Sequence, residues 1–126
     1  MKNGKLQIGL IGAGNIAQNA HIPTYLKQND VELVGICDIK EERAKEVAQK
    51  YGMKYAFKDF NDLLAIDEID AVSVCTWNNF HASAAIAAAK AGKHVLCEKP
   101  MAMNVQEAEN MLKAAKENKV VFMMGF

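Results

Sequence analysis

The sequence lacks net charge, because its 126 residues include 15 Lys and Arg against 15 Asp and Glu. Nothing therefore draws the molecule electrostatically to phosphate backbones or anionic lipids, and we expect neither a nucleic acid nor a membrane as partner. Long apolar runs are also missing, since none approaches the roughly 20 residues that a membrane helix needs. Residues 1–5 lead into only a short apolar segment and not into a signal-peptide core, so the sequence predicts a cytoplasmic protein.

Cysteine is scarce and shows no pairing pattern. Cys37, Cys75 and Cys97 are odd in number, none forms a Cys-x-x-Cys pair, and each lies inside or at the end of an apolar run. We expect reduced, small core residues rather than redox centres or metal ligands, and no metal site.

Hydrophobic residues make up 51% of the chain, enough for one substantial core, and no repeat, low-complexity tract or linker divides it. Short β-branched runs alternate with longer segments whose apolar residues recur at spacings of three and four. The expected strands are 6–11, 31–37, 55–57, 71–75, 94–97 and 120–125. The expected helices are 16–28, 41–50, 60–65, 80–91 and 105–118.

The expected strands show little alternation of apolar and polar residues, which favours a parallel sheet covered on both faces. Right-handed crossovers then limit the fold class to α/β, a doubly wound parallel sheet of the Rossmann type with three α/β/α layers. Gly52, Gly92 and Asn118 stand just past expected helices, where a C-terminal cap needs a left-handed residue. Because the chain stops at the sixth strand with no helix to follow, we expect residues 1–126 to be one domain cut from a longer protein.

Residues 12–17 read Gly-Ala-Gly-Asn-Ile-Ala, a Gly-x-Gly-x-x-Ala pattern between the first strand and the first helix. The first glycine permits a tight turn, the second lets the backbone approach a pyrophosphate, and the small Ala17 lets helix pack on strand. Amides at a helix N-terminus favour an anion. A turn without a ligand would use the same pattern, but its position favours a dinucleotide. The candidate cofactor-binding residues here are Gly12, Ala13, Gly14, Asn15 and Ile16.

Asp38 ends the second strand, where the adenosine ribose of a dinucleotide should lie. Its carboxylate could accept hydrogen bonds from both ribose hydroxyls and would repel a 2′-phosphate, which favours NAD over NADP. Lys40 and Arg43 weaken this preference because either could reach a phosphate, so NADP stays open. A second interpretation makes Asp38 the N-cap of the helix that begins at Glu41.

Polar residues follow the fourth strand, in a loop that a doubly wound sheet places beside the cofactor. Thr76 and Asn78 have short hydrogen-bonding groups suited to ribose or phosphate, and Trp77 offers a flat apolar wall. Helix capping is the other interpretation of Asn78. His81, one turn into the next helix, is either a cofactor contact or an exposed helix residue. His21, in the first helix, could also cover the cofactor.

The fifth strand ends in Glu98-Lys99-Pro100, near the expected position of a nicotinamide. Pro100 excludes the helical conformation for Lys99 and holds it extended, so that the amine can point into the cleft. Lysine acts as a base only when its pKa is lowered from about 10.4, whereas its protonated form polarises a substrate oxygen unaided. Glu98 could bond Lys99, a cofactor hydroxyl or nearby backbone. An ordinary charged turn is the alternative for all three residues.

Together these motifs resemble the Gfo/Idh/MocA family, oxidoreductases related to glucose–fructose oxidoreductase and inositol 2-dehydrogenase. The resemblance rests on residues 12–17, Asp38, residues 76–78 with His81, and residues 92–100, and it covers essentially the whole chain. It implies the dinucleotide-binding domain of an enzyme that transfers a hydride between NAD(P) and a secondary alcohol of a sugar, cyclitol or related polyol. At the matching positions it implies that Lys99 is catalytic and that Glu98 lies near the cofactor.

Two features depart from the family pattern. Trp77 stands where the family usually has Pro, and the C-terminal α/β domain, which supplies substrate contacts and often the oligomer interface, is absent from this chain. We therefore expect the longer parent to be an NAD(P)-dependent dehydrogenase and a homo-oligomer, with the isolated chain inactive. The alternative is a non-catalytic dinucleotide-binding or redox-sensing module, because a fold alone does not fix a function.

Overall fold

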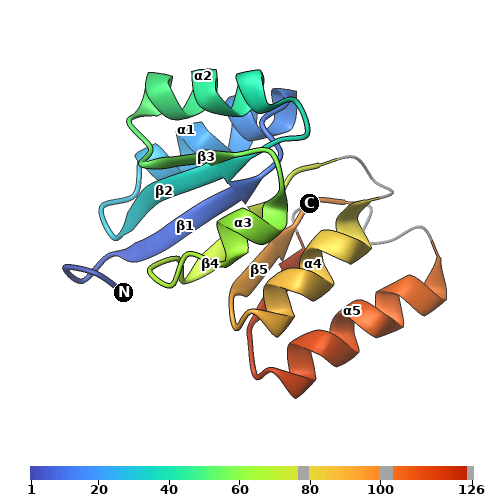
Figure 1. The fold of residues 1–126 in the computed structure, drawn as a ribbon. Helices are drawn as coiled ribbons and strands as arrows, with labels where there is room; N and C mark the ends of the chain where they lie inside the picture. The colour runs from blue at the N-terminus through green and yellow to red at the C-terminus, as the bar shows by residue number, and fades with distance from the viewer. Residues whose placement is uncertain (77–79, 100–103, 125–126) are drawn as a thin grey trace.

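Six parallel strands form one sheet in the order β3-β2-β1-β4-β5-β6 in this computed structural model, which describes residues 1–76, 80–99 and 104–124 (Figure 1). The strands are β1 (Leu6–Ile11), β2 (Val31–Cys37), β3 (Tyr55–Phe57), β4 (Ala71–Val74), β5 (His94–Cys97) and β6 (Phe122–Met124). The helices are η1 (Ala17–His21), α1 (Ile22–Leu26), α2 (Glu41–Tyr51), α3 (Phe60–Leu64), α4 (His81–Lys90) and α5 (Val105–Glu117). The predicted doubly wound Rossmann order is confirmed, and the strand order reverses between β1 and β4.

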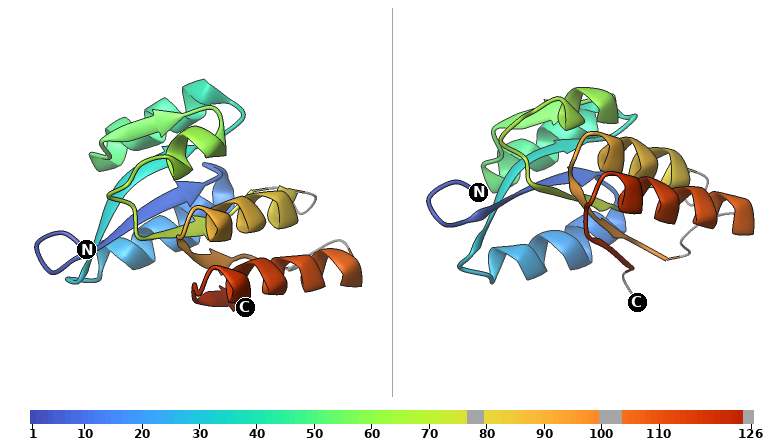
Figure 2. Two further views of the ribbon diagram at one scale, coloured as in Figure 1. Left: turned by 60° about the horizontal axis from the view of Figure 1, so that its bottom comes forward. Right: turned by 90° about the horizontal axis from the view of Figure 1, so that it is seen from below.

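Helices cover both faces of the sheet (Figure 2). A separate cluster of hydrophobic side chains is buried on each face. On one face, η1, α1 and α2 pack on Leu10 and Ile36, both fully buried. On the other, α3, α4 and α5 pack on strand residues that include Val72 and Val95. Each fully buried side chain of this size contributes about 1.5–3 kcal/mol, so the two clusters provide most of the driving force that closes the three layers.

The first helical segment differs from the prediction of one continuous helix over 16–28. It begins as the π-helix η1, in which the Ile22 amide donates to the Ala17 carbonyl five residues back, and continues as the short helix α1. Pro23 explains the change, because proline lacks an N–H and its ring crowds the carbonyl four residues earlier. The wider turn relieves that clash, and it places His21 inside the protein, where the residue is buried.

Two of the three predicted C-terminal caps are confirmed. Gly52 and Gly92 follow α2 and α4 with φ of 71° and 78°. The prediction for Asn118 is wrong, since its φ is −97° and the left-handed residue is Lys119, with φ 55°. Both the amide and the side-chain Nδ2 of Asn118 donate to the Ala114 carbonyl. These bonds keep Asn118 in line with α5, so the left-handed residue that ends the helix comes one position later.

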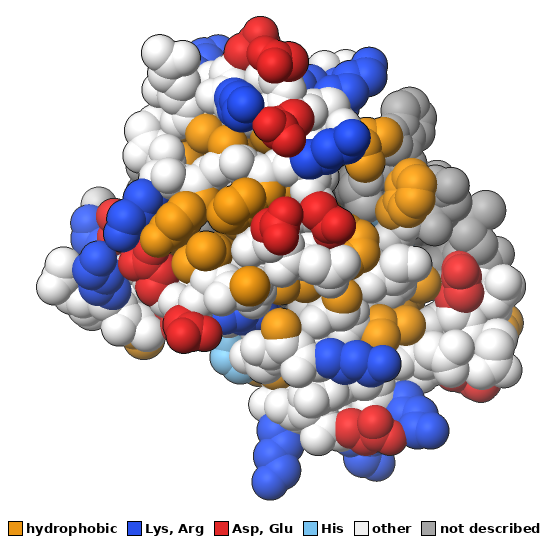
Figure 3. Space-filling model, viewed as in Figure 1, with side chains coloured by type: hydrophobic (Ala, Val, Ile, Leu, Met, Phe, Trp, Pro, Cys, Tyr) orange, Lys and Arg blue, Asp and Glu red, His pale blue; other side chains and the backbone are white. Residues whose placement is uncertain are grey.

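Acidic and basic side chains are interspersed over the face of the molecule seen in Figure 3. Within the described ranges, no helix is long and apolar enough to cross a membrane. The same part of the chain holds no cluster of three or more His, Cys, Asp or Glu residues suited to a metal ion. Cys37, Cys75 and Cys97 are free and buried, as predicted for small core residues.

Candidate functional site

The carboxyl ends of the parallel strands meet along one edge of the sheet, and backbone hydrogen bonds join them beyond the strands themselves. The amide of Gly12 donates to the Cys37 carbonyl at 2.8 Å, and that of Cys75 donates to the Ile11 carbonyl at 2.7 Å. The amide of Glu98 donates to the Val74 carbonyl at 3.0 Å. These bonds fix the positions of the residues that leave β1, β2, β4 and β5, where ligands bind in doubly wound sheets.

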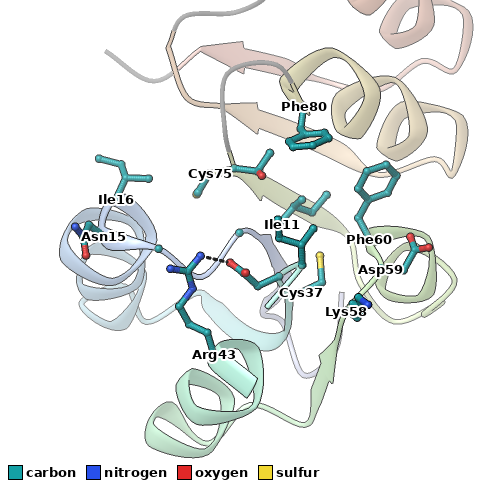
Figure 4. A pocket seen from close by; sticks show the side chains of 15 residues that line it. Ile11, Asn15, Ile16, Cys37, Arg43, Lys58, Asp59, Phe60, Cys75 and Phe80 are labelled. Atoms are coloured by element: carbon teal, nitrogen blue, oxygen red, sulfur yellow. Dashed lines mark hydrogen bonds and ion pairs between the residues drawn. The ribbon is translucent and has the colours of Figure 1, made fainter. Parts of the chain in front are cut away.

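A cavity of about 560 Å³ lies at this edge, across the point where the strand order reverses (Figure 4). Its polar lining comes from the glycine loop after β1, from Asp38 and Arg43, and from Thr76 after β4. Its apolar walls come from Ile16, Ile39, Phe60 and Phe80. Volumes of 300–1,000 Å³ with mostly apolar walls and a few polar groups are typical of small-molecule sites.

Gly12 shapes the turn that opens the cavity. Its φ is 106°, and a Cβ at this position would lie 2.8 Å from the carbonyl carbon and oxygen of Cys75 and 2.9 Å from the Thr76 nitrogen. No side chain fits there, because real Cβ atoms do not approach backbone so closely. Gly14 is different, since a Cβ there would meet only Arg43, at 4.0 Å, on the cavity side. The first glycine therefore makes the turn, and the second leaves open space, as the sequence predicts.

The start of the first helix presents amides to the cavity. Gln18 donates to the Gly14 carbonyl at 3.0 Å, so the amides of Asn15 and Ile16, which precede it, lie in the first turn and have no acceptor within the helix. Asn15 and Ile16 both line the cavity. The Ala13 amide is not available to a ligand, because it donates to Oδ2 of Asp38 at 2.8 Å. The pair Asn15 and Ile16 is thus the anion-facing part of the loop.

Asp38 lines the cavity with a carboxylate that the protein already uses. Oδ2 accepts from the Ala13 amide and from Nη2 of Arg43 at 2.9 Å, and Oδ1 accepts from the Lys40 amide at 2.8 Å. Burial acts to raise the pKa of Asp38, but the two amides and the guanidinium outweigh it and hold that pKa below its usual value. The alternative in which Asp38 caps α2 is wrong, because Lys40 occupies the N-cap position and has no capping side-chain bond.

The three hydrogen bonds limit what Asp38 offers a ligand. A carboxylate has about four acceptor positions, so one remains, on Oδ1. Asp38 therefore has room for one ribose hydroxyl while Arg43 stays in place, and not for the two that the sequence suggested. Arg43 keeps its side chain 35% exposed, and its Nε is buried with no hydrogen-bond partner among the described residues. Figure 4 shows the Arg43 guanidinium reaching from α2 across the mouth of the loop to this carboxylate.

Two aromatic walls of the cavity, Phe60 and Phe80, were not predicted from the sequence. Phe60 is the first residue of α3 and Phe80 is the N-cap of α4, so each lies at the start of a helix at the carboxyl edge of the sheet and faces the cavity (Figure 4). Both residues were assigned only to the expected helices 60–65 and 80–91, and their position where a helix begins after a strand was the available signal. Lys58 and Asp59, which follow β3, also line the cavity and were not singled out from the sequence.

The loop after β4 and the first residue of α4 contain four predicted site residues. Thr76 lines the cavity. Trp77 and Asn78 lie outside the described residues. His81 is only 1% exposed, so the alternative of an exposed helix residue is wrong. Its Nε2 donates to the Thr76 carbonyl at 2.9 Å, which ties the loop to the first turn of α4, and it does not line the cavity.

Glu98 and Lys99 leave β5 beyond the end of the cavity, and neither lines it. Oε1 of Glu98 accepts a hydrogen bond from Nε2 of His21 at 2.7 Å, so His21 covers the tip of β5 rather than the cavity. Burial, with the charge of Glu98 as the next cause, raises the pKa of the Cys75 thiol. Lys99 is exposed at the strand tip. Pro100 lies outside the described residues.

Comparison with known proteins shows the family of the chain. Residues 6–126 match the Gfo/Idh/MocA profile, described as an oxidoreductase family with an NAD-binding Rossmann fold. The chain belongs to the Gfo/Idh/MocA family. The resemblance inferred from the glycine loop, Asp38 and the Glu-Lys-Pro motif is therefore confirmed.

Relatives in this family include characterised dehydrogenases. The chain is 38% identical over 117 residues to the D-glucoside 3-dehydrogenase of Escherichia coli, covering 93% of this chain and 33% of that protein. It is 37% identical over 121 residues to the myo-inositol 2-dehydrogenase of Thermotoga maritima, covering 96% and 36%. KijD10, a 3-ketoreductase from Actinomadura kijaniata crystallised with NADP, superposes with a TM-score of 0.91 at 30% identity, covering 97% and 39%. The chain thus spans about a third of each relative.

Proposed function

We propose that this chain binds NAD with its adenosine over β2, its diphosphate on the first turn after β1, and its nicotinamide riboside over the tips of β4 and β5. The observation that carries the proposal is the cavity at the strand-order reversal, into which the Asn15 and Ile16 amides and the Asp38–Arg43 pair converge. A dinucleotide lies across this crevice in doubly wound sheets, with one half on each side of the reversal.

The residues at the cavity fit such a ligand. Two unbonded first-turn amides and the helix dipole favour a diphosphate, and Gly14 leaves room for its close approach. The remaining acceptor position on Asp38 fits one ribose hydroxyl. Ile39, 60% exposed, and Phe60 provide apolar surface for an adenine ring. We assign the cofactor-binding roles to these groups, to Thr76, and to Trp77 and Asn78 in the loop after β4.

Cofactor choice follows from the charge at the β2 tip. The carboxylate of Asp38 repels a 2′-phosphate, which supports NAD as the preferred cofactor. Arg43 supports some binding of NADP, because its guanidinium is partly exposed and lies beside the same ribose position. The NADP bound to KijD10, a related structure, is consistent with a family in which this choice varies.

The complete protein acts, in this proposal, as an NAD(P)-dependent dehydrogenase on a secondary alcohol of a sugar, cyclitol or related polyol. The named activities of the glucoside and inositol dehydrogenases support this substrate class. Bound nicotinamide supplies or accepts the hydride. Lys99 moves the proton at the substrate oxygen, because it leaves β5 on the nicotinamide side. The three reduced cysteines support a cytoplasmic location, and a domain such as the relatives carry beyond this length would form the substrate pocket and a homo-oligomer interface.

Calorimetry and kinetics test the two parts separately. Titration of the 126-residue chain with NADH should give saturable binding with one dinucleotide per chain. In the complete gene product, Lys99→Met should leave the Kd for NADH within about twofold and lower kcat for polyol oxidation by about 100-fold or more, the range of a lost general acid or base. Lys90→Met, at the far end of α4, is the matched control and should change neither. Binding without turnover in the complete wild-type protein would support the non-catalytic alternative.

A further inference from the structure

One largely buried side-chain pair joins two elements far apart in the sequence at the proposed nicotinamide side of the site. Nε2 of His21, in the π-helix η1, donates to Oε1 of Glu98, at the tip of β5, across 2.7 Å. The His21 side chain is 6% exposed and that of Glu98 is 19% exposed. A charge-assisted hydrogen bond this short and this shielded is stronger than an exposed ion pair, because neither water nor salt competes with it effectively.

The histidine reaches this position because its helix is locally widened and anchored. The π turn over Ala17–His21 directs His21 under the sheet edge, and π turns of this kind occur frequently at functional sites. One turn later, the Tyr25 hydroxyl is hydrogen-bonded to the Ser73 hydroxyl on β4, and Ser73 is fully buried. The ring of Tyr25 packs at 55° to that of His21, with centroids 6.4 Å apart. The phosphate-side helix is thus fastened to β4 and β5 at two successive turns.

Glu98 is held from both sides, and this fixes the residue that follows it. Its amide donates to the Val74 carbonyl, and its carboxylate accepts from His21. Lys99 is the next residue and is exposed at the same strand tip. A lateral shift of the Glu98 side chain would therefore move the start of the Lys99 segment relative to the helix that faces the diphosphate.

From these contacts we infer that His21 is a positioning residue: through Glu98 it sets the tip of β5 against the phosphate-binding helix, and so places the nicotinamide half of the cofactor beside Lys99. The inference rests on the proposed function. His21 acts only through Glu98, since it does not line the cavity. The adenosine half, over β2, is built from Asp38 and the glycine loop and does not depend on this pair.

Calorimetry with two probes separates the positioning role from general stability. NADH carries both halves of the cofactor, whereas ADP carries the adenosine and diphosphate but lacks the nicotinamide riboside. His21→Ala should raise the Kd for NADH by about tenfold, the factor expected for one lost hydrogen bond to a charged group, and change the Kd for ADP less than twofold. His21→Gln keeps an N–H donor at a similar distance from the backbone and should restore most of the NADH affinity.

Glu98→Ala is the second variant, because Glu98 lies at a strand tip and its removal does not open the core. It should reproduce the selective loss of NADH affinity, and the double variant His21→Ala with Glu98→Ala should lose no more than either alone. Equal losses for NADH and ADP, additive losses in the double variant, or unchanged affinity for NADH would each overturn the inference. A wild-type chain that binds neither probe would instead overturn the proposed function, and the inference with it.

Discussion

The two sides of the carboxyl edge are built differently. Around β1 and β2, ligand-facing groups are mostly backbone amides and one carboxylate that is hydrogen-bonded three times within the protein. Around β4 and β5, the polar groups are side chains paired across elements, His21 with Glu98 and His81 with the Thr76 carbonyl. The first side has its shape before a ligand arrives because the chain path dictates it. The second side depends on particular side chains, and a single substitution can displace it.

Because of this difference, we expect the β1–β2 side to determine diphosphate binding and the β4–β5 side to determine the rate of the reaction. Amides at a helix start and a glycine turn bind diphosphate whatever the substrate, because they recognise only the anion. The groups beside Lys99 must instead place one ring and one alcohol within reach of each other, and small misplacements there cost large factors in rate. Variants on the β1–β2 side should therefore affect NADH and ADP alike, whereas variants on the β4–β5 side should affect only nucleotides with a nicotinamide riboside.

The largest effect should come from filling the backbone turn. Gly12→Ala should lower the free energy of unfolding by about 2–5 kcal/mol and abolish binding of both NADH and ADP, since a Cβ would overlap the backbone of Cys75. Gly52→Ala is the matched control, because Gly52 also has a positive φ but no atom within 4 Å, and it should cost about 1–2 kcal/mol. Urea unfolding measures both. Equal costs would show that the close approach at Gly12 does not constrain the site.

A smaller effect should follow from removing the charge at the β2 tip. Asp38→Asn should shift the ratio of the Kd for NADPH to that for NADH by about tenfold in favour of NADPH, because the repulsion of a 2′-phosphate falls and Arg43 is released to face it. Calorimetry with both dinucleotides gives the ratio. Glu42→Gln is the matched control. It removes one exposed charge from α2, the helix that carries Arg43, and should leave the ratio unchanged. A ratio that stays constant in Asp38→Asn would mean that Asp38 does not face the ribose.

The smallest effect should appear as a pH dependence of stability. The pKa of Asp38 is lowered in the folded protein, so its contribution to stability is complete above its unfolded value of about 3.9 and is lost as the pH falls through and below that value. Thermal unfolding should be measured between about pH 6 and pH 2, a range that spans this pKa. The melting temperature should fall less steeply with decreasing pH in Asp38→Asn than in the wild type. Asp70 and Glu68, whose pKa values are also lowered, contribute to the acid dependence that remains. An equally steep fall in melting temperature in the variant and in the wild type would contradict the hydrogen bonds described at Asp38.

Much of the β1–β2 side could be predicted from the sequence, because its determinants are local. The glycine turn, the first-turn amides and the strand-ending Asp38 lie within short segments whose periodicity and residue types define them. The hydrogen bond from the Ala13 amide to the Asp38 carboxylate was not predictable, because it depends on how closely the ends of β1 and β2 lie beside each other. The same holds for Asn118, where one side-chain bond shifted the cap by a residue.

The β4–β5 side was predicted in outline only. The position of Glu98 and Lys99 at a strand tip follows from the strand pattern, but their partners do not. His21 and Glu98 are 77 residues apart, and they meet because the π turn over Ala17–His21, just before Pro23, rotates the helix, which no pattern of apolar residues reports. Phe60 and Phe80 were likewise assigned only to expected helices, and their contact with the cavity was not predicted. Tertiary contact, not local preference, decides these cases.

A crystal structure of the chain grown with NADH tests the central claim most directly. We expect the diphosphate oxygens within hydrogen-bonding distance of the Asn15 and Ile16 amides, the adenosine ribose at Oδ1 of Asp38, and the nicotinamide riboside beside Thr76 and the tip of β5. A dinucleotide bound away from these amides, or one with its adenosine over β5 and its nicotinamide over β2, would contradict the assignment of the two sides.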